Sequence, residues 1–276
     1  MKNIMKLAAV SIAALVCIIG LTACGNSSES GGNAKTKIVV GTTGLTPGAS
    51  EQGNDASKDG GVQGMDIDII KEVAKRNNWD VEWKVAPVDA LFGMMDNKQI
   101  TTIANTIAIN EKRKEKYNFD DPYAYGSYSL VAKSDGPVID SMDSLKGKSV
   151  AVLANGDQKI SLEQTNEKYN LGMKILAVDD NGAVLQSVIN GTTDLAYIGT
   201  SAAALANKSL HLNLQLFDPG NRDFKLVHPF LKTEESDKIR EQMNKTIHEM
   251  REDGTLKEIS MKWFGKDLTV QPEAKK

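Results

Sequence analysis

Cysteine is nearly absent from this 276-residue sequence, which has only Cys17 and Cys24. No cysteine follows Cys24, so the rest of the chain has no thiol for a disulfide, a thiolate metal site or a cysteine nucleophile. A domain built from it must be stabilised by its hydrophobic core alone. The remaining length, about 240 residues, can bury enough apolar surface for one large or two smaller domains.

A strong charge of one sign and a long hydrophobic run are also missing. The formal net charge is −3, aromatic residues make up 5% of the chain, and no basic patch has interleaved aromatics. This argues against nucleic acid as a partner. The single apolar run, residues 7–20, is about fourteen residues long, whereas a membrane span needs about twenty.

The three histidines, His211, His228 and His248, are isolated in the sequence. None has a histidine partner at helical spacing or a carboxylate cluster nearby, so we expect no metal site and no cofactor.

The N-terminus has the features of an export signal. Lys2 and Lys6 precede the apolar run, and Leu21-Thr22-Ala23-Cys24 follows it. This ending resembles a bacterial lipobox, which implies a signal peptide over residues 1–23 and a lipid on Cys24. The polar, Gly- and Ser-rich residues 24–36 would form a flexible tether. We therefore expect a lipid-anchored protein on the extracytoplasmic face of the cell membrane; the alternative is an ordinary signal peptide with a chance cysteine.

The rest of the chain alternates between two hydrophobic periods. Apolar runs or alternating patterns predict strands, and stripes at helical spacing predict helices between them. The predicted strands are residues 37–43, 80–86, 100–108, 149–154, 174–178, 195–199 and 212–217. The predicted helices start at Met65 and Val88 in the first half and cover residues 158–169, 183–189, 201–206 and 239–250 in the second.

Strand–helix alternation predicts an α/β fold with parallel sheets and helices on both faces. Two such blocks are visible, and the helical segment after residue 222 has too few strands for its own sheet, so we expect it to pack on the first block. The predicted domains are residues 37–127 with 223–268, and residues 128–222, followed by a tail over 269–276. Two chain crossings would form a hinge, and the facing carboxyl ends of strands would form a cleft.

Five segments in order resemble the type-3 solute-binding proteins of ABC importers for polar amino acids. The resemblance covers residues 37–266, and its wording is nearest the cystine-binding branch. The segments are GMDIDIIKEVAKR (64–76), INEKRKEKYNFDDPY (109–123), DSLKGKSVAVLANGDQ (143–158), VLQSVINGTTDLAYIG (184–199) and EMREDGTLKEISMKWFG (249–265). It implies a two-lobed type II periplasmic-binding-protein fold and a monomer that delivers a small solute to a permease and its ATPase.

The resemblance also implies where the ligand binds. The arginine of the NEKR segment, Arg113, would hold the ligand's carboxylate, because a planar guanidinium can make two parallel hydrogen bonds to it. Its neighbours Lys112, Lys114 and Lys116 are expected on the solvated face of a helix. The other implied ligand positions are Thr43, Leu45, Asn105, Thr106, Ala108, Gly156, Asp157, Gln158 and Gly199.

Several of these positions depart from the family pattern. Leu45 stands where an aromatic residue usually covers the ligand, and Ala108 replaces a hydroxyl residue. Gly199 replaces the acid that pairs with the ligand's ammonium, and an unpaired buried charge costs several kcal/mol. Either another acid, such as Asp157, replaces it, or the ligand has no ammonium; Asp157 could equally be an N-terminal helix residue.

Tyr123, Tyr125 and Tyr128 could stack on a ligand or pack at the chain crossings, and Trp83 is expected in the core. Three functions remain open. A transport receptor is favoured; a sensory or accessory lipoprotein with an altered site, and an enzyme such as a dehydratase on the same scaffold, are the alternatives. We expect no enzymatic activity, because no triad, metal cluster or close carboxylate pair stands out in the sequence.

Overall fold

The computed structural model describes residues 35–155, 157–219 and 224–271, and the chain from Lys35 onward forms one compact unit. No helix within these ranges is long and apolar enough to cross a membrane. The predicted signal peptide, Cys24, most of the tether and Gly156 lie outside the described residues.

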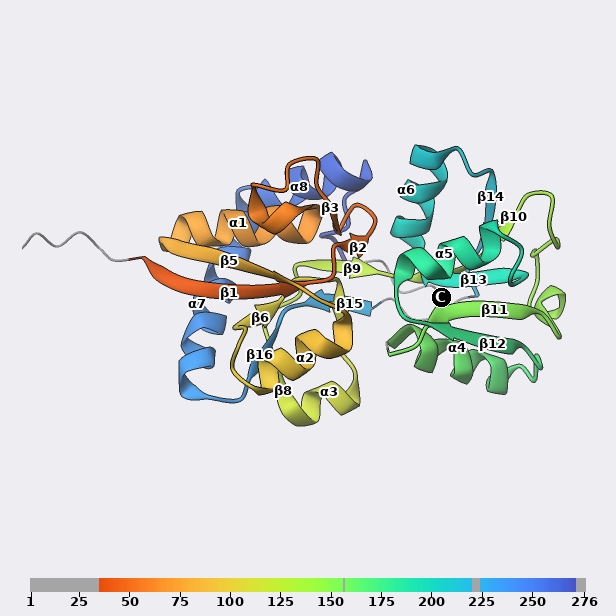
Figure 1. Ribbon diagram of the computed structural model, residues 1–276, viewed down its shortest axis with the longest axis horizontal. Helices are drawn as coiled ribbons and strands as arrows, with labels where there is room; N and C mark the ends of the chain where they lie inside the picture. Colours follow the sequence, from red (N-terminus) through yellow and green to blue (C-terminus); the bar gives the residue numbers. More distant parts are fainter. Residues whose placement is uncertain (1–34, 156, 220–223, 272–276) are drawn as a thin grey trace, which may run out of the picture. The chain divides into compact units, whose positions relative to one another are not determined.

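The first sheet is parallel and has alternating faces. It consists of β5 (Trp79–Val85), β1 (Thr36–Thr42) and β6 (Thr102–Ile103) in this spatial order. Ile38 and Val40 of β1 are fully buried against one layer of helices, and Val39 between them packs on the opposite side. Helices therefore cover both faces of this sheet, as the alternation predicted (Figure 1).

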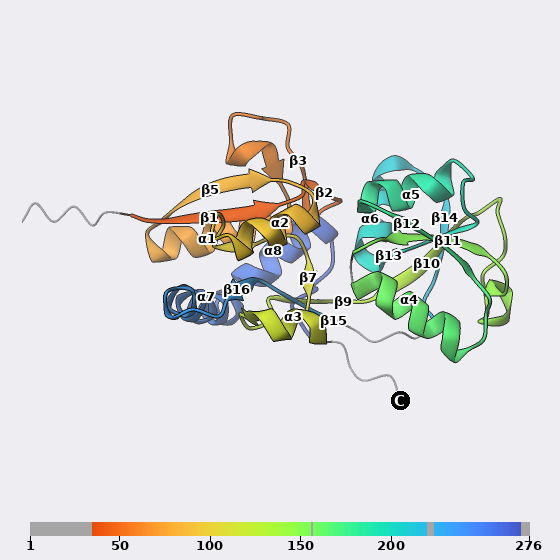
Figure 2. The same ribbon diagram turned by 60° about the horizontal axis from the view of Figure 1, so that its bottom comes forward.

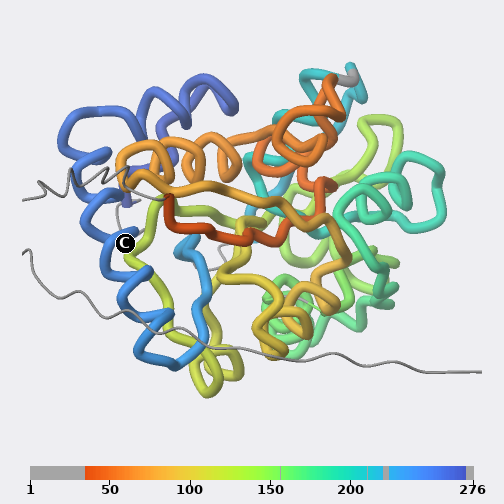
Figure 3. The backbone as a smooth tube through the Cα atoms, turned by 60° about the vertical axis from the view of Figure 1, so that its left-hand side comes forward, coloured from red at the N-terminus to blue at the C-terminus, as the bar shows by residue number. Residues whose placement is uncertain are grey.

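The helices on these two faces come from distant parts of the chain. One face carries α1 (Met65–Asn77), α7 (Glu234–Glu252) and α8 (Thr255–Phe264), and the other carries α2 (Val88–Asp96). Figure 3 shows the C-terminal helices beside α1. The segment after residue 222 thus packs on the first sheet, as expected, because the Met243–Ile247–Met250 stripe of α7 needs a buried partner.

Short antiparallel sheets surround this layer. They are β7 (Ile107–Ala108), β15 (Phe224–Val227) and β9 (Ala124–Gly126); β16 (Pro229–Leu231) with β8 (Tyr117–Phe119); and β2 (Leu45–Thr46), β3 (Ser50–Gln52) and β4 (Val62–Gln63). A 3-10 turn at Asp59–Gly61 precedes β4, and the short helix α3 (Glu111–Lys116) precedes β8.

The second sheet is mixed and lies between three helices (Figure 2). Its order is β12 (Lys174–Val178), β11 (Ser149–Leu153), β13 (Leu195–Gly199), β10 (Tyr128–Lys133) and β14 (Leu214–Phe217). Helix α4 (Asp157–Lys168) packs on one face, and α5 (Asn181–Ile189) and α6 (Thr200–Leu210) pack on the other. A 3-10 turn at Asp143–Leu145 precedes β11.

The two segments that run between the sheets lie side by side. Strand β9 leads into β10 of the second sheet, and β15, which follows β14 in the chain, pairs with β9 in antiparallel register, Phe224 opposite Gly126. Tyr128 stacks on Phe224 with ring centroids 4.3 Å apart. This aromatic contact joins the two crossing segments.

The predicted helices are all present, with ends that differ by a few residues. The predicted strand over residues 100–108 is wrong as a single element, because it is divided into β6 and β7. Thr106 between them has a left-handed backbone, with φ of 49°. Its amide donates a hydrogen bond to the carboxylate of Asp66 instead of to a neighbouring strand. No local sequence pattern indicates this partner.

Candidate ligand-binding site

Arg113 projects from α3 toward a cavity. Asn110 caps the helix by accepting a 2.9 Å hydrogen bond from the Arg113 amide. The guanidinium Nη1 donates to the Ala108 carbonyl at 2.8 Å, and its Cζ lies 5.0 Å from the centre of the Phe92 ring. Within the described residues, no carboxylate approaches this guanidinium closely enough for an ion pair.

Burial lowers the pKa of Arg113, and the nearby acids, Asp157 and Asp89 among them, oppose this shift. An arginine remains charged even so, because its ordinary pKa is above 12. The structure therefore holds a partly buried positive charge whose remaining N–H groups are available to an anion.

The space in front of Arg113 is a cavity of about 40 Å³ open to water, here called the Arg113 chamber. Asp157 and Arg113 are its only charged lining residues among those described. Burial raises the pKa of Asp157, while the Arg113 charge lowers it. The lining residues are Val88, Asn105, Thr106, Ile107, Ala108, Arg113, Tyr128, Leu153, Asn155, Asp157, Gln158 and Asn181.

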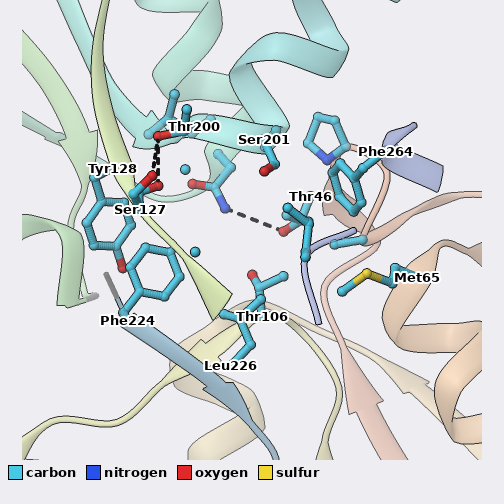
Figure 4. A pocket seen from close by; sticks show the side chains of 18 of the residues that line it. Thr46, Met65, Thr106, Ser127, Tyr128, Thr200, Ser201, Phe224, Leu226 and Phe264 are labelled. Atoms are coloured by element: carbon cyan, nitrogen blue, oxygen red, sulfur yellow. Dashed lines mark hydrogen bonds between the residues drawn. The ribbon is translucent and has the colours of Figure 1, made fainter. Parts of the chain in front are cut away.

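A second cavity, here called the Phe264 chamber, is shown in Figure 4. It has about 60 Å³ open to water, enough for several water molecules. The two chambers share four lining residues, Thr106, Tyr128, Gln158 and Asn181. Hydroxyl and apolar groups line the rest, including Thr46, Met65, Ser127, Thr200, Ser201, Phe224 and Phe264.

A chain of amides lies at the boundary between the chambers. Gln158 Nε2 donates to Asn181 Oδ1 at 3.3 Å, and Asn181 Nδ2 donates to the Thr46 hydroxyl at 3.4 Å. Gln158 Oε1 is buried and has no hydrogen-bond partner among the residues that the structure describes. A buried acceptor without a donor costs about 1–3 kcal/mol, so this atom is a place where a ligand donor would be stabilised.

Thr106 is held from behind by a buried carboxylate. Its amide donates to Asp66 Oδ2 at 2.5 Å, and the Tyr123 hydroxyl donates to Asp66 Oδ1 at 2.9 Å. Burial raises the pKa of Asp66 to about 6, although the neighbouring His228 and these two donors act in the opposite direction. The wall of both chambers therefore depends on one fully buried acid.

His228 belongs to the same interior group, where a carboxylate from a distant part of the sequence lies within hydrogen-bond distance of it. Its Nδ1 lies 2.6 Å from Asp120 Oδ2, and its ring stacks on Tyr123 at 4.6 Å. The Asp120 carboxylate raises the pKa of His228 against the effect of burial. His248 likewise meets Asp121 at 2.8 Å. Among the described residues, no group of three or more potential ligands could hold a metal.

Comparison with known proteins identifies this architecture. The family model of bacterial extracellular solute-binding proteins, family 3, matches residues 42–266. The chain belongs to this family. It is 33% identical to the probable amino-acid-binding protein YxeM of Bacillus subtilis, over 94% of this chain and 95% of that protein. It is 30% identical to the L-cystine-binding protein TcyA of the same organism, over 96% of this chain and all of the relative.

A solved structure from a study of glutathione import via GshT and the cystine importer TcyBC of Streptococcus mutans has the same fold. The TM-score is 0.77 at 24% identity, covering 86% of this chain and 98% of that one. The type II periplasmic-binding-protein fold that the resemblance implied is thus confirmed.

In this solute-binding protein, the structure brings together most of the residues that the sequence singled out. Asn105, Thr106, Ala108, Arg113, Asp157 and Gln158 line the Arg113 chamber, and Gly199 lines the Phe264 chamber. Lys112, Lys114 and Lys116 are exposed. Tyr125 and Tyr128 line the Phe264 chamber, whereas Tyr123 is buried and Trp83 packs on the core.

Two predicted positions lie outside both chambers. The Thr43 hydroxyl donates to Asn105 Oδ1 at 2.7 Å, and Asn105 also accepts from the Thr43 amide, so each fixes the other. Leu45 is 43% exposed, and its neighbour Thr46 faces the cavity in its place. A shift by one residue along a strand turns a side chain to the other face.

Other lining residues were missed in the sequence. Asn181 is in the first turn of α5, and Thr200 and Ser201 are in the first turn of α6, each after a strand of the second sheet. The rule that ligands lie beyond the carboxyl ends of strands could have indicated them. Phe264 ends α8, and only the packing of that helix brings it to the cavity.

Proposed function

We propose that this protein is the extracytoplasmic substrate-binding lipoprotein of an ABC importer. Its ligand is a small polar solute that carries a carboxylate, such as an amino acid of the cystine type or a derivative. The observation that supports this most directly is Arg113, a partly buried guanidinium that faces a cavity without a carboxylate partner among the described residues.

The chemistry of the Arg113 chamber suits a zwitterionic head group. The guanidinium can make two parallel hydrogen bonds to a carboxylate, and these gain strength where water is excluded. Asp157, the other charged residue of this chamber, takes the place of the acid that is missing at Gly199 and pairs with the ligand's ammonium. Its raised pKa reflects a carboxylate that gains from a positive partner.

Binding closes two domains around the solute. The first consists of residues 37–127 with 223–268 and the second of residues 128–222, with the paired crossing strands β9 and β15 as the hinge. Contacts that join opposite walls support a closed form: Asn181 with Thr46, and Asn155 with Asp89. The closed monomer is the form that the permease and its ATPase receive.

Anchoring is assigned to Cys24. The lipobox-like Leu21-Thr22-Ala23-Cys24 supports lipidation, and the family is extracellular. A lipid there keeps the receptor beside the permease.

The proposal is tested first by a thermal-shift screen of amino acids, cystine, small peptides and other carboxylates. A ligand at a hundred times its dissociation constant adds about 2.7 kcal/mol to the folded state, which such a screen detects. Calorimetry on Arg113→Ala should then show an affinity loss of about 2–5 kcal/mol, as expected for truncating one partner of a buried charge pair.

Lys114→Ala is the matched control, because Lys114 lies next to Arg113 but is exposed and pairs only with Glu111 among the described acids. It should leave affinity unchanged. Equal losses in both variants would show a diffuse positive patch, and no binding by any compound would contradict the transport function.

A further inference from the structure

The Phe264 chamber is a second compartment of the cavity whose charge differs from that of the first. Its described lining contains no Asp, Glu, Lys, Arg or His side chain. The Arg113 chamber beside it has one residue of each sign. A ligand whose charged head lies at Arg113 therefore extends its other end into surroundings without a counter-charge.

One hydroxyl of this chamber, that of Thr200, is already engaged with neighbouring serines. It lies 2.9 Å from the hydroxyl of Ser127, as Figure 4 shows, and 2.8 Å from that of Ser129. Phe224 and Phe264 supply apolar surface. An ionised tail here would lose water without gaining an oppositely charged side chain, at a cost of several kcal/mol.

One polar atom at the entrance to this chamber lacks a partner. Gln158 Oε1 is buried and has no donor within the described part of the chain, while the Nε2 of the same side chain donates to Asn181. A carbonyl oxygen accepts an N–H or O–H but gives nothing to a carboxylate. It therefore favours a tail that brings an N–H or O–H donor over one that brings a carboxylate.

Gly199 shows how the chamber stays uncharged. It lines the cavity, and a Cβ placed there would meet no atom within 4 Å. Its φ of −52° is one that any residue can adopt. A side chain would therefore fit at this point of the wall, and its absence leaves both space and neutrality.

We propose that the Phe264 chamber selects ligands with an uncharged tail, and that Gln158 Oε1 accepts a hydrogen bond from that tail. This rests on the proposed function, since Arg113 must hold the carboxylate. The ligand class is that of small α-amino acids or related carboxylates with neutral, amide-bearing or apolar tails. This narrows the solute class proposed above, because cystine itself, whose far end carries both an ammonium and a carboxylate, is predicted to bind more weakly than methionine.

Isosteric ligand pairs test this directly on the full-length protein in detergent, by calorimetry. Glutamine should bind at least about a hundredfold tighter than glutamate, and citrulline at least about a hundredfold tighter than arginine, because each pair differs in tail charge at nearly constant shape. Equal affinities within either pair, or a preference for the charged member, would overturn the proposal.

The variant Gly199→Asp supplies the missing charge, and Gly199→Asn is its neutral control of the same shape. Asp should raise the affinity for arginine relative to citrulline by at least about tenfold, the effect of a partly solvated ion pair, whereas Asn should not. An equal gain for both ligands would show that Asp at this position pairs with the α-ammonium that they share, and would overturn the assignment of the chamber to the tail. Thermal unfolding of both variants checks that the fold is kept. A similar change in the ratio of arginine to citrulline affinity with Asn and with Asp would count against selection by charge.

Failure of this inference is distinct from failure of the transport function. If charged and neutral tails bind equally and Arg113→Ala abolishes both, the chamber does not select by charge, and the binding function stands. If no carboxylate binds in an Arg113-dependent manner, both proposals are wrong.

Discussion

The amide of Thr106, in the wall of the cavity, donates a 2.5 Å hydrogen bond to the carboxylate of Asp66, forty positions earlier at the start of α1. Thr106 has a φ of 49°, a conformation that is unfavourable for a β-branched residue by about 1–2 kcal/mol. The hydrogen bond offsets this strain. The shape of the proposed ligand site is thus tied to the ionisation of a buried acid behind it.

Stability should therefore depend on pH through Asp66. Burial raises its pKa to about 6 in the folded protein, above its ordinary value near 4. The folded state thus binds this proton more tightly, so the contribution of Asp66 to stability is complete below about pH 4 and is lost as pH rises through about 6. The loss is about 3 kcal/mol.

Asp66→Asn removes this titration and can still accept from the Thr106 amide. The free energy of unfolding of the variant, relative to the natural protein, should rise by about 2–2.5 kcal/mol between pH 4 and pH 7. Urea unfolding over this range measures it. Asp140→Asn, at an exposed position, is the control and should give parallel curves; parallel curves for Asp66→Asn would show that Asp66 does not titrate here.

Two glycines should respond in opposite ways to alanine. Gly64 precedes α1 with a φ of 138°, and a Cβ there would lie 2.2 Å from the Ala49 carbonyl oxygen. Gly64→Ala should destabilise the protein by about 3 kcal/mol or more, because the backbone at Ala49 or at Gly64 itself would have to move. Gly93 is inside α2, and its Cβ would meet nothing within 4 Å.

Gly93→Ala should accordingly stabilise the protein by about 0.5–1 kcal/mol, the helix-propensity difference. Chemical denaturation of both variants gives the two values. A destabilised Gly93→Ala would mean that α2 needs its glycine for something other than helix formation.

Closure should be visible in solution. If the crossing strands form a hinge, the solute found by the screen should reduce the radius of gyration measured by small-angle X-ray scattering. Arg113→Ala, at the same solute concentration, should stay at the ligand-free value because it loses affinity. Compaction of both proteins, or of neither, would contradict ligand-driven closure.

Membrane attachment should depend on one residue. Cys24→Ala removes the proposed lipid site without touching the residues that form the core. The variant should leave the membrane fraction and keep the thermal unfolding of the natural protein. Retention in the membrane fraction would show that another part of the chain anchors it.

The fold could be predicted well from the sequence, because its signals are local. Two patterns show which face of an element must be buried: the period-2 alternation around Ile38 and Val40, and the helical stripe from Met243 to Met250. Burying apolar area is the dominant favourable term in folding, so elements with such clear faces have few ways to pack. The position of Arg113 in a cavity wall could also be predicted, because its segment resembles a family motif and a guanidinium has a distinct geometry.

The pairing of the interior polar groups could not be predicted in the same way. His228 looked isolated because Asp120 is 108 positions away, and nothing near Thr106 points to Asp66. Such pairs form where hydrophobic packing buries polar groups away from water. A polar group buried there is stable only if it has a hydrogen-bond partner.

The same reason separates the two parts of the ligand site. Local sequence carries the chemistry of Arg113 and the lack of an acid at Gly199. The neutrality of the Phe264 chamber arises only when the end of α8 and the start of α6 line the same cavity, since the charge around a cavity depends on all of its walls. The sequence determines the chemistry of each side chain. The dielectric and the counter-charges around a ligand depend on which distant residues the fold brings to the same cavity.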